Sequence, residues 1–265
     1  HAARLVGSNP TEGTNQEKSM KKLPLIISIV VIAGIALFLF ARNTNDNQPS
    51  IPRQTGLEEI SFSNPKKGAH YESNTPEHGS RLPGVPVNVV VNFNFDLAPE
   101  SQIQILKDSK DYAAGTTQID QNKLTLRRNM DPDSPDGLYK VEYRACWPDG
   151  SCHDGYFQFA IDRKLAEQAD DLRNQREVEI DLEQIAFQPQ IIHVSKGTKI
   201  TWHNHDSIGH YVNTDSHPAH TYYPAQNSKL LNEDETYALT FDIPGVYPYH
   251  CSAHAERMPG MIIVE

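Results

Sequence analysis

A lone cysteine close to the carboxyl-terminal end of the chain is followed at short spacing by a histidine and a methionine. The three residues are Cys251, His254 and Met258. A thiolate and two imidazoles in one plane, with a long axial thioether, form the ligand set of electron-transfer copper sites. The set requires one more imidazole from elsewhere, and the segment 200–210 is rich in histidine. These residue types therefore indicate a copper site.

The two segments together resemble the cupredoxin family, which includes plastocyanin, amicyanin and pseudoazurin. In that family a strand ending in Trp-x-Asn precedes the first histidine, and Gly-x-Tyr-x-Tyr-x-Cys-x-x-His followed by Met supplies the other ligands. This chain has Trp202 and Asn204 in the first motif, and residues 245–258 match the second. The resemblance covers residues 178–265 and implies a Greek-key β-sandwich holding one type 1 copper, with electron transfer through the edge of the second histidine. The implied copper ligands are His210, Cys251, His254 and Met258.

The chain departs from the family pattern at two places. Tyr211 follows the first histidine where the family often has asparagine, so Cys251 is expected to lack a supporting hydrogen bond. Met261 is a rival axial ligand, but it begins the last strand pattern and is expected to be a core residue. Met258 is therefore preferred as the axial ligand.

Five other histidines lie in the same region of the sequence. A single histidine is more often a surface residue than a metal ligand. We therefore expect these side chains to be exposed or to contact the ligands rather than to bind metal: His203, His205, His217, His220 and His250.

The residues that precede this domain also predict β-structure. Segments 87–95, 139–145 and 157–159 alternate apolar and polar residues, which is typical of half-buried antiparallel strands, and turn residues lie between them. Residues 57–163 are therefore predicted to form a β-sandwich of immunoglobulin type. The segment 164–177 is charged and free of Gly, Pro and β-branched residues, so it is expected to be a linker that is helical.

The first sandwich resembles the CopC family of periplasmic copper-binding proteins. The matching features are Ala-His at 69–70, Ser-x-x-Pro-x-x-Gly at 73–79, Tyr-Arg followed by Asp-Gly at 143–150, and a final Gly-x-Phe-x-Phe strand. The resemblance implies a second copper site at His70 and His153, with a purely structural domain as the alternative. In that family the first histidine is amino-terminal, which His70 is not if the membrane anchor is retained.

Cys146 and Cys152 flank a Trp-Pro-Asp-Gly-Ser turn that brings two strand ends together. A disulfide is the simpler interpretation in an oxidising compartment. The alternative is a metal site made of both thiols and His153.

An uncharged apolar run, Leu23–Ala41, is long enough to span a bilayer and follows two lysines. We expect it to be a single transmembrane helix rather than a cleaved signal peptide, because a small-x-small motif occurs inside the run and not after it. The lysines predict that residues 1–22 are cytoplasmic and that the domains lie on the extracytoplasmic face of the cell membrane. Residues 1–19 precede a Met-Lys-Lys typical of a start, and whether they are native stays open. Residues 42–56 are a polar tether.

The sequence thus predicts an all-β, membrane-anchored copper protein that carries single electrons to or from a redox partner protein. The net charge of −10 and the absence of clustered Lys and Arg argue against nucleic acid as a partner. The alternative is a copper-binding, chaperone or copper-resistance protein that buffers or delivers the metal. An enzyme is not expected, because it would need an open position at the copper.

Overall fold

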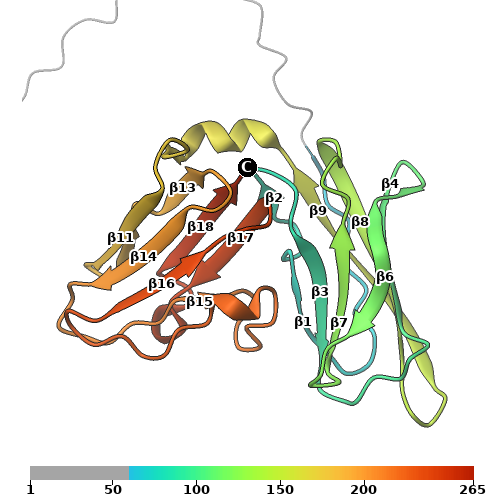
Figure 1. The fold of residues 1–265 in the computed structure, drawn as a ribbon. Coiled ribbons are helices and arrows are strands. Elements are labelled where there is room, and N and C mark those ends of the chain that lie inside the picture. The colour runs from blue at the N-terminus through green and yellow to red at the C-terminus, as the bar shows by residue number, and fades with distance from the viewer. Residues whose placement is uncertain (1–59) are drawn as a thin grey trace, which may run out of the picture. The chain divides into compact units, whose positions relative to one another are not determined.

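A computed structural model describes residues 60–265 of the chain, which fold into two β-sandwiches (Figure 1). The predicted all-β class is confirmed, since only short 3-10 helices interrupt the strands of this part of the chain. The predicted membrane span, residues 23–41, and the tether, residues 42–56, lie outside the described residues. Within residues 60–265, no helix has the length and apolar character that crossing a membrane requires.

The first sandwich is built from two antiparallel-rich sheets that enclose one apolar core. One sheet has the order β1 (Tyr71–Thr75), β3 (Asn88–Phe93), β7 (Thr125–Met130) and β6 (Ala113–Ile119). The other has the order β2 (Arg81–Leu82), β9 (Cys152–Ile161), β8 (Gly137–Cys146), β4 (Gln102–Lys107) and β5 (Lys110–Asp111). The inward side chains of β3, β4, β8 and β9 form the core, as the alternation in the sequence predicts.

The second sandwich spans the carboxyl-terminal part of the chain. Its five-stranded sheet has the order β10 (Asp170–Asp171), β13 (Ile191–Val194), β18 (Pro259–Val264), β17 (Gly245–His250) and β15 (Asn213–Thr214). Its four-stranded sheet has the order β12 (Ala186–Gln188), β11 (Glu177–Glu183), β14 (Lys199–Asn204) and β16 (Thr236–Thr240). Trp202 on β14 is fully buried against Tyr249 of β17, so aromatic packing joins the two sheets.

The linker between the sandwiches is helical in only part of the predicted range. A 3-10 helix, η1, spans Arg163–Gln168, and the chain then pairs through β10 with β13. Leu172 packs against the second core, and the carbonyls of Arg173 and Gln175 accept hydrogen bonds from Ser195 and Thr198. The prediction of a helix over 164–177 was therefore wrong for its second half, because pairing and packing against the second sandwich outweigh local helix propensity.

A loop of the second sandwich covers the outer face of β3. All residues of β3 are buried, although every second side chain points away from the first core. Asn92 contacts Ser216 and Thr221, and Arg127 of β7 donates hydrogen bonds to the carbonyls of Thr221 and Tyr222. These polar contacts hold the loop 215–223 against the first sandwich.

Candidate metal centre

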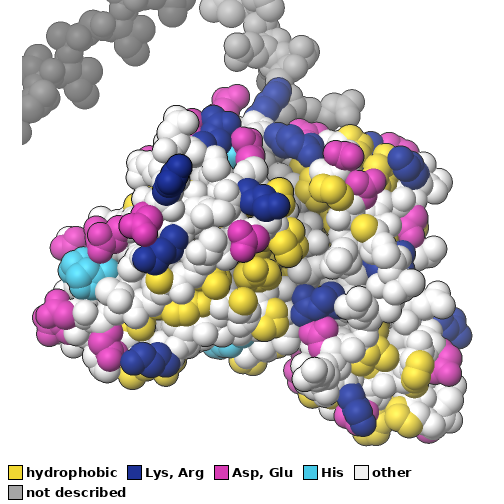
Figure 2. Space-filling view, viewed as in Figure 1, with side chains coloured by type: hydrophobic (Ala, Val, Ile, Leu, Met, Phe, Trp, Pro, Cys, Tyr) yellow, Lys and Arg dark blue, Asp and Glu magenta, His cyan; other side chains and the backbone are white. Residues whose placement is uncertain are grey.

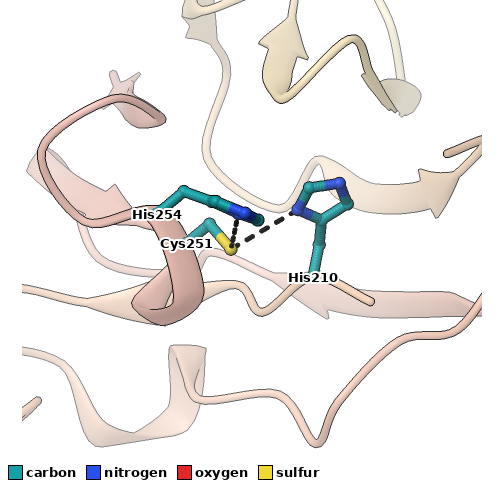
Figure 3. Close-up of side chains that lie close together, drawn as sticks. All are labelled: His210, Cys251 and His254. Carbon is teal, nitrogen blue, oxygen red and sulfur yellow. Dashed lines mark hydrogen bonds between the residues drawn. The ribbon is translucent and has the colours of Figure 1, made fainter. Parts of the chain in front are cut away.

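Three metal-binding side chains converge at one end of the second sandwich. The Sγ atom of Cys251 lies 3.5 Å from Nδ1 of His210 and 3.6 Å from Nδ1 of His254 (Figure 3). Their donor atoms all lie within 4.8 Å of one another. Cys251 and His210 are fully buried, with an exposed fraction of 0% each. One thiol and two imidazoles therefore face a common point, and two of the three side chains are shielded from water.

His210 comes from the loop after β14, and Asn204 at the end of that strand organises the loop. The Asn204 amide nitrogen donates to the carbonyls of Ile208 and Leu231, at 2.9 and 3.0 Å. His210 also exchanges two backbone hydrogen bonds with Leu231, at 3.0 and 2.8 Å. The asparagine of the Trp-x-Asn motif thus fixes the position from which His210 reaches the centre.

Asp206 holds the other ring nitrogen of His210. Its Oδ2 atom lies 2.8 Å from Nε2 of His210, so Nε2 carries the proton and Nδ1 is left free for a metal. The backbone N–H groups of Gln184 and Ile185 donate to the same carboxylate. Burial opposes ionisation of Asp206, but these donors and His210 outweigh it, so the pKa of Asp206 is lowered.

The Cys251 sulfur receives a hydrogen bond from the protein backbone. The N–H of Tyr211 donates to Sγ, with a nitrogen to sulfur distance of 3.3 Å. The expectation that Tyr211 leaves the sulfur without support was therefore wrong, because the donor is the backbone and does not depend on the side chain at this position. Such a bond stabilises the thiolate.

Met258 lies in the same core as the cysteine, whereas Met261 does not. Met258 is 1% exposed and belongs to the cluster that contains Cys251. The N–H of Cys251 donates to the carbonyl of Met258, which closes the ligand loop. Met261 packs instead against the core of the first sandwich. This placement favours Met258 over Met261 as a ligand.

His254 lies in the short 3-10 helix η3 (Ser252–His254) and is half-buried. Burial, followed by the nearby His210 and Arg257, lowers its pKa, so the neutral imidazole that binds metals is favoured. Two exposed apolar side chains, Ile208 at 43% and Leu230 at 41%, are contributed by the loops that flank His210. The site therefore has a buried interior and a partly exposed imidazole.

Replacing Asn204 by alanine tests how the His210 loop is held. The Asn204→Ala variant removes the amide donor from the carbonyl of Ile208 and one of two donors from the carbonyl of Leu231, so we expect the free energy of unfolding to fall by about 1–3 kcal/mol. Chemical denaturation measures this change. The Asn232→Ala variant serves as a control at an exposed turn, and an equal loss in both variants would contradict this role of Asn204.

Comparison with known proteins identifies both sandwiches. Residues 174–265 match the family of copper binding proteins of the plastocyanin/azurin type, and residues 71–162 match the CopC domain. Two parts of the chain therefore match copper-protein families, a CopC domain first and a cupredoxin domain after it. Both families consist of electron carriers or copper-binding proteins rather than enzymes, and the cofactor is copper.

Two curated relatives are amicyanins, and each matches about one third of this chain. Amicyanin-alpha of Methylorubrum extorquens is 29% identical over 87 residues, which are 33% of this chain and 71% of the relative. Amicyanin of Paracoccus denitrificans is 28% identical over 86 residues, or 32% of this chain and 63% of the relative. This chain therefore spans less than two thirds of the second relative. A purple cupredoxin of Nitrosopumilus maritimus is 26% identical, with a TM-score of 0.30, and the match covers 33% of this chain and 99% of that structure.

The donor set of the cupredoxin domain fits copper. Imidazole and thiolate are ligands that copper prefers, and Asp206 and the Tyr211 N–H supply the supporting contacts such ligands need. His210, Cys251 and His254 would hold the ion, and Met258, in the same core as Cys251, would be a further ligand.

The two histidines predicted for the CopC domain both pack against one tryptophan. The ring of His70 packs against Trp147 at 5.2 Å and that of His153 at 5.3 Å, and His70 also contacts Asn94. The family match begins one residue after His70. Within residues 60–265, the clusters of at least three metal-binding side chains include neither histidine. The second copper site at His70 and His153 stays a prediction.

The structure joins Cys146 to Cys152 by a disulfide across the end of the β8–β9 hairpin. Neither sulfur is then a thiolate that could bind metal together with His153. Of the three cysteines in the chain, Cys251 is the one with a free thiol.

The structure brings the other five histidines into two groups that the sequence did not reveal. His203 and His205 lie on one face of the β14 end beside Glu179. The second group contains His217, His220 and His250, whose donor atoms lie within 4.8 Å of one another. Burial, followed by His250 and His217, lowers the pKa of His220 to about 4. The alternating pattern of β14 could have indicated the first group, because residues two apart on a strand share a face.

Proposed function

We propose that the protein is a type 1 copper protein that carries single electrons on the extracytoplasmic face of the cell membrane. The observation that carries this proposal is the convergence of the buried His210 and Cys251 with the half-buried His254. Bound copper supplies a one-electron couple between Cu(I) and Cu(II).

The protein contributes a ligand geometry that does not change with the charge of the ion. His210 is fixed by Asp206 and Leu231, and Cys251 is fixed by the Tyr211 N–H and the Met258 carbonyl. A rigid ligand set requires little rearrangement when the electron moves. The burial of these side chains also excludes water from the metal, which leaves no evident position for a substrate.

The half-buried ring of His254 provides the route to a redox partner. Ile208 and Leu230 add exposed apolar surface around the same end of the domain. On the face shown in Figure 2, Lys and Arg alternate with Asp and Glu and form no basic patch. With a net charge of −10, a protein partner with a basic surface suits this chain better than a nucleic acid.

The location of the protein rests on its sequence and on its families. The apolar run 23–41 after two lysines supports a membrane anchor with both domains outside. A disulfide in the CopC domain agrees with an oxidising compartment.

Electrochemistry of the copper-loaded full chain tests the carrier function. A carrier gives a reversible one-electron couple, and its copper stays bound in both oxidation states in the presence of a competing chelator. Loss of copper to the chelator during the redox cycle would contradict electron carriage.

Copper handling is the second candidate, and the CopC match is the observation that favours it. It predicts exchangeable copper, and the same chelator experiment separates it from electron carriage.

A further inference from the structure

A cluster of three histidines lies in the cupredoxin domain beside the candidate copper site, on side chains that the site does not use. His217 and His220 come from the loop 215–223, and His250 is the last residue of β17. Their ring centroids are 5.1 Å apart for His220 and His250, and 5.4 Å for each of the other two pairs. The three imidazoles thus surround one point.

We propose that His217, His220 and His250 form a second metal site, which binds a divalent ion that prefers imidazole and, among these, Cu(II) most tightly. Three nitrogen donors suit copper and zinc, and divalent copper binds more strongly than zinc to a given set of such ligands. This proposal does not depend on electron transfer at the first site.

The spacing of the donor atoms fits one shared ion. Nε2 of His220 lies 3.2 Å from Nε2 of His250. Metal–imidazole bonds of about 2.0–2.1 Å place two nitrogens of a tetrahedral site about 3.3–3.4 Å apart. The observed separation is therefore close to the one that a bound ion would impose. The hydroxyl of Ser252 also lies 3.0 Å from Nε2 of His220 and is a further polar contact at this point.

Asp215 orients the buried member of the cluster. Its Oδ1 atom lies 2.6 Å from Nδ1 of His250, so Nδ1 holds the proton and Nε2 is directed to the other histidines. A carboxylate on the remote nitrogen of an imidazole is the usual support of a metal-binding histidine. Asp206 makes the corresponding contact with His210 at the first site. In each centre, a carboxylate thus contacts the ring nitrogen of one histidine that faces away from the metal position.

The loop 215–223 is held in place, and the cluster is accessible to solvent. Ser216 contacts Ser73 and Asn92 of the CopC domain, and Thr221 contacts Asn92. A cleft of about 810 Å³ is lined by His217, His250 and Asp215 together with residues of the CopC domain, and His217 is exposed. An ion can therefore reach the site without unfolding the loop, and three protein ligands leave room for a water.

A stepwise copper titration of the full chain tests the proposal. Cu(II) is added up to one equivalent, until the thiolate absorption band no longer grows. Further Cu(II) is then added, the unbound metal is removed, and the number of coppers per chain is measured. We expect two coppers in the unmodified protein and one in the double variant His217→Ala/His220→Ala, with the band unchanged. Electron paramagnetic resonance should show imidazole nitrogen coupling for the second ion, and this signal should be lost in the variant.

The histidine pair on β14 provides the matched control. The double variant His203→Ala/His205→Ala should still bind two coppers. One copper in the unmodified protein, or a second copper that persists in the His217/His220 variant, would overturn the proposal. The absorption band measures copper binding at the first site, and the number of coppers per chain measures binding at the second. The loss of binding at one site can therefore be distinguished from its loss at the other.

Discussion

The Cys251→Ser variant should lose the intense visible absorption of the copper-loaded protein completely. A serine hydroxyl stays protonated at neutral pH and does not replace a thiolate as a ligand, so no sulfur to copper transition remains. The affinity for Cu(II) at the first site should fall by more than the 10- to 100-fold typical of removing a supporting contact. Visible absorption and a competition titration with a chelator measure the two effects.

The disulfide cysteines give the control for this variant. The double variant Cys146→Ser/Cys152→Ser removes the other two cysteine sulfurs of the chain but changes no residue of the cupredoxin domain. Its absorption band should be the same as that of the unmodified protein. A band that survives in Cys251→Ser would show that the colour arises elsewhere.

The Asp206→Asn variant should have a higher reduction potential than the unmodified protein. The carboxylate beside Nε2 of His210 makes the imidazole a better donor and stabilises Cu(II) more than Cu(I). A supporting contact of this kind is typically worth about 10- to 100-fold in affinity, and each tenfold loss for Cu(II) relative to Cu(I) corresponds to about 59 mV. We therefore expect a rise of about 60–120 mV, measured by voltammetry.

The same substitution should also lower stability, since an amide cannot accept all the hydrogen bonds of this carboxylate. Both oxygens accept a backbone N–H, from Gln184 and Ile185, and one of these donors would be left unpaired. Asp181→Asn is the matched control, because Asp181 contacts His205 at 2.9 Å away from the copper ligands. An equal rise of the potential in the control variant would contradict the role of Asp206.

The sequence indicated most of the first site because its residues lie in two short motifs. The spacing of Cys251, His254 and Met258 places them on one loop, and this order of residues carries chemical information without a structure. The alternating strands of both domains were also visible, since one face of each is buried. These features depend on residues close together in the sequence, so they can be predicted without a structure.

The features that the sequence did not reveal depend on contacts between distant segments. Tyr211 supports Cys251 through its backbone N–H, and no residue type encodes that contact. His220 meets His250 across thirty positions because the loop 215–223 folds back on β17. The second half of the linker pairs with β13 and does not continue as a helix, because Leu172 packs against the second core. In each case tertiary packing decides the outcome.

The most direct measurement is anomalous X-ray diffraction at the copper edge from crystals of the full chain loaded with one equivalent of copper. We expect a single strong peak within bonding distance of Nδ1 of His210, Sγ of Cys251 and Nδ1 of His254, on the side of the site where Met258 lies. A peak elsewhere in the chain, with no peak at these side chains, would show that they do not form the copper site.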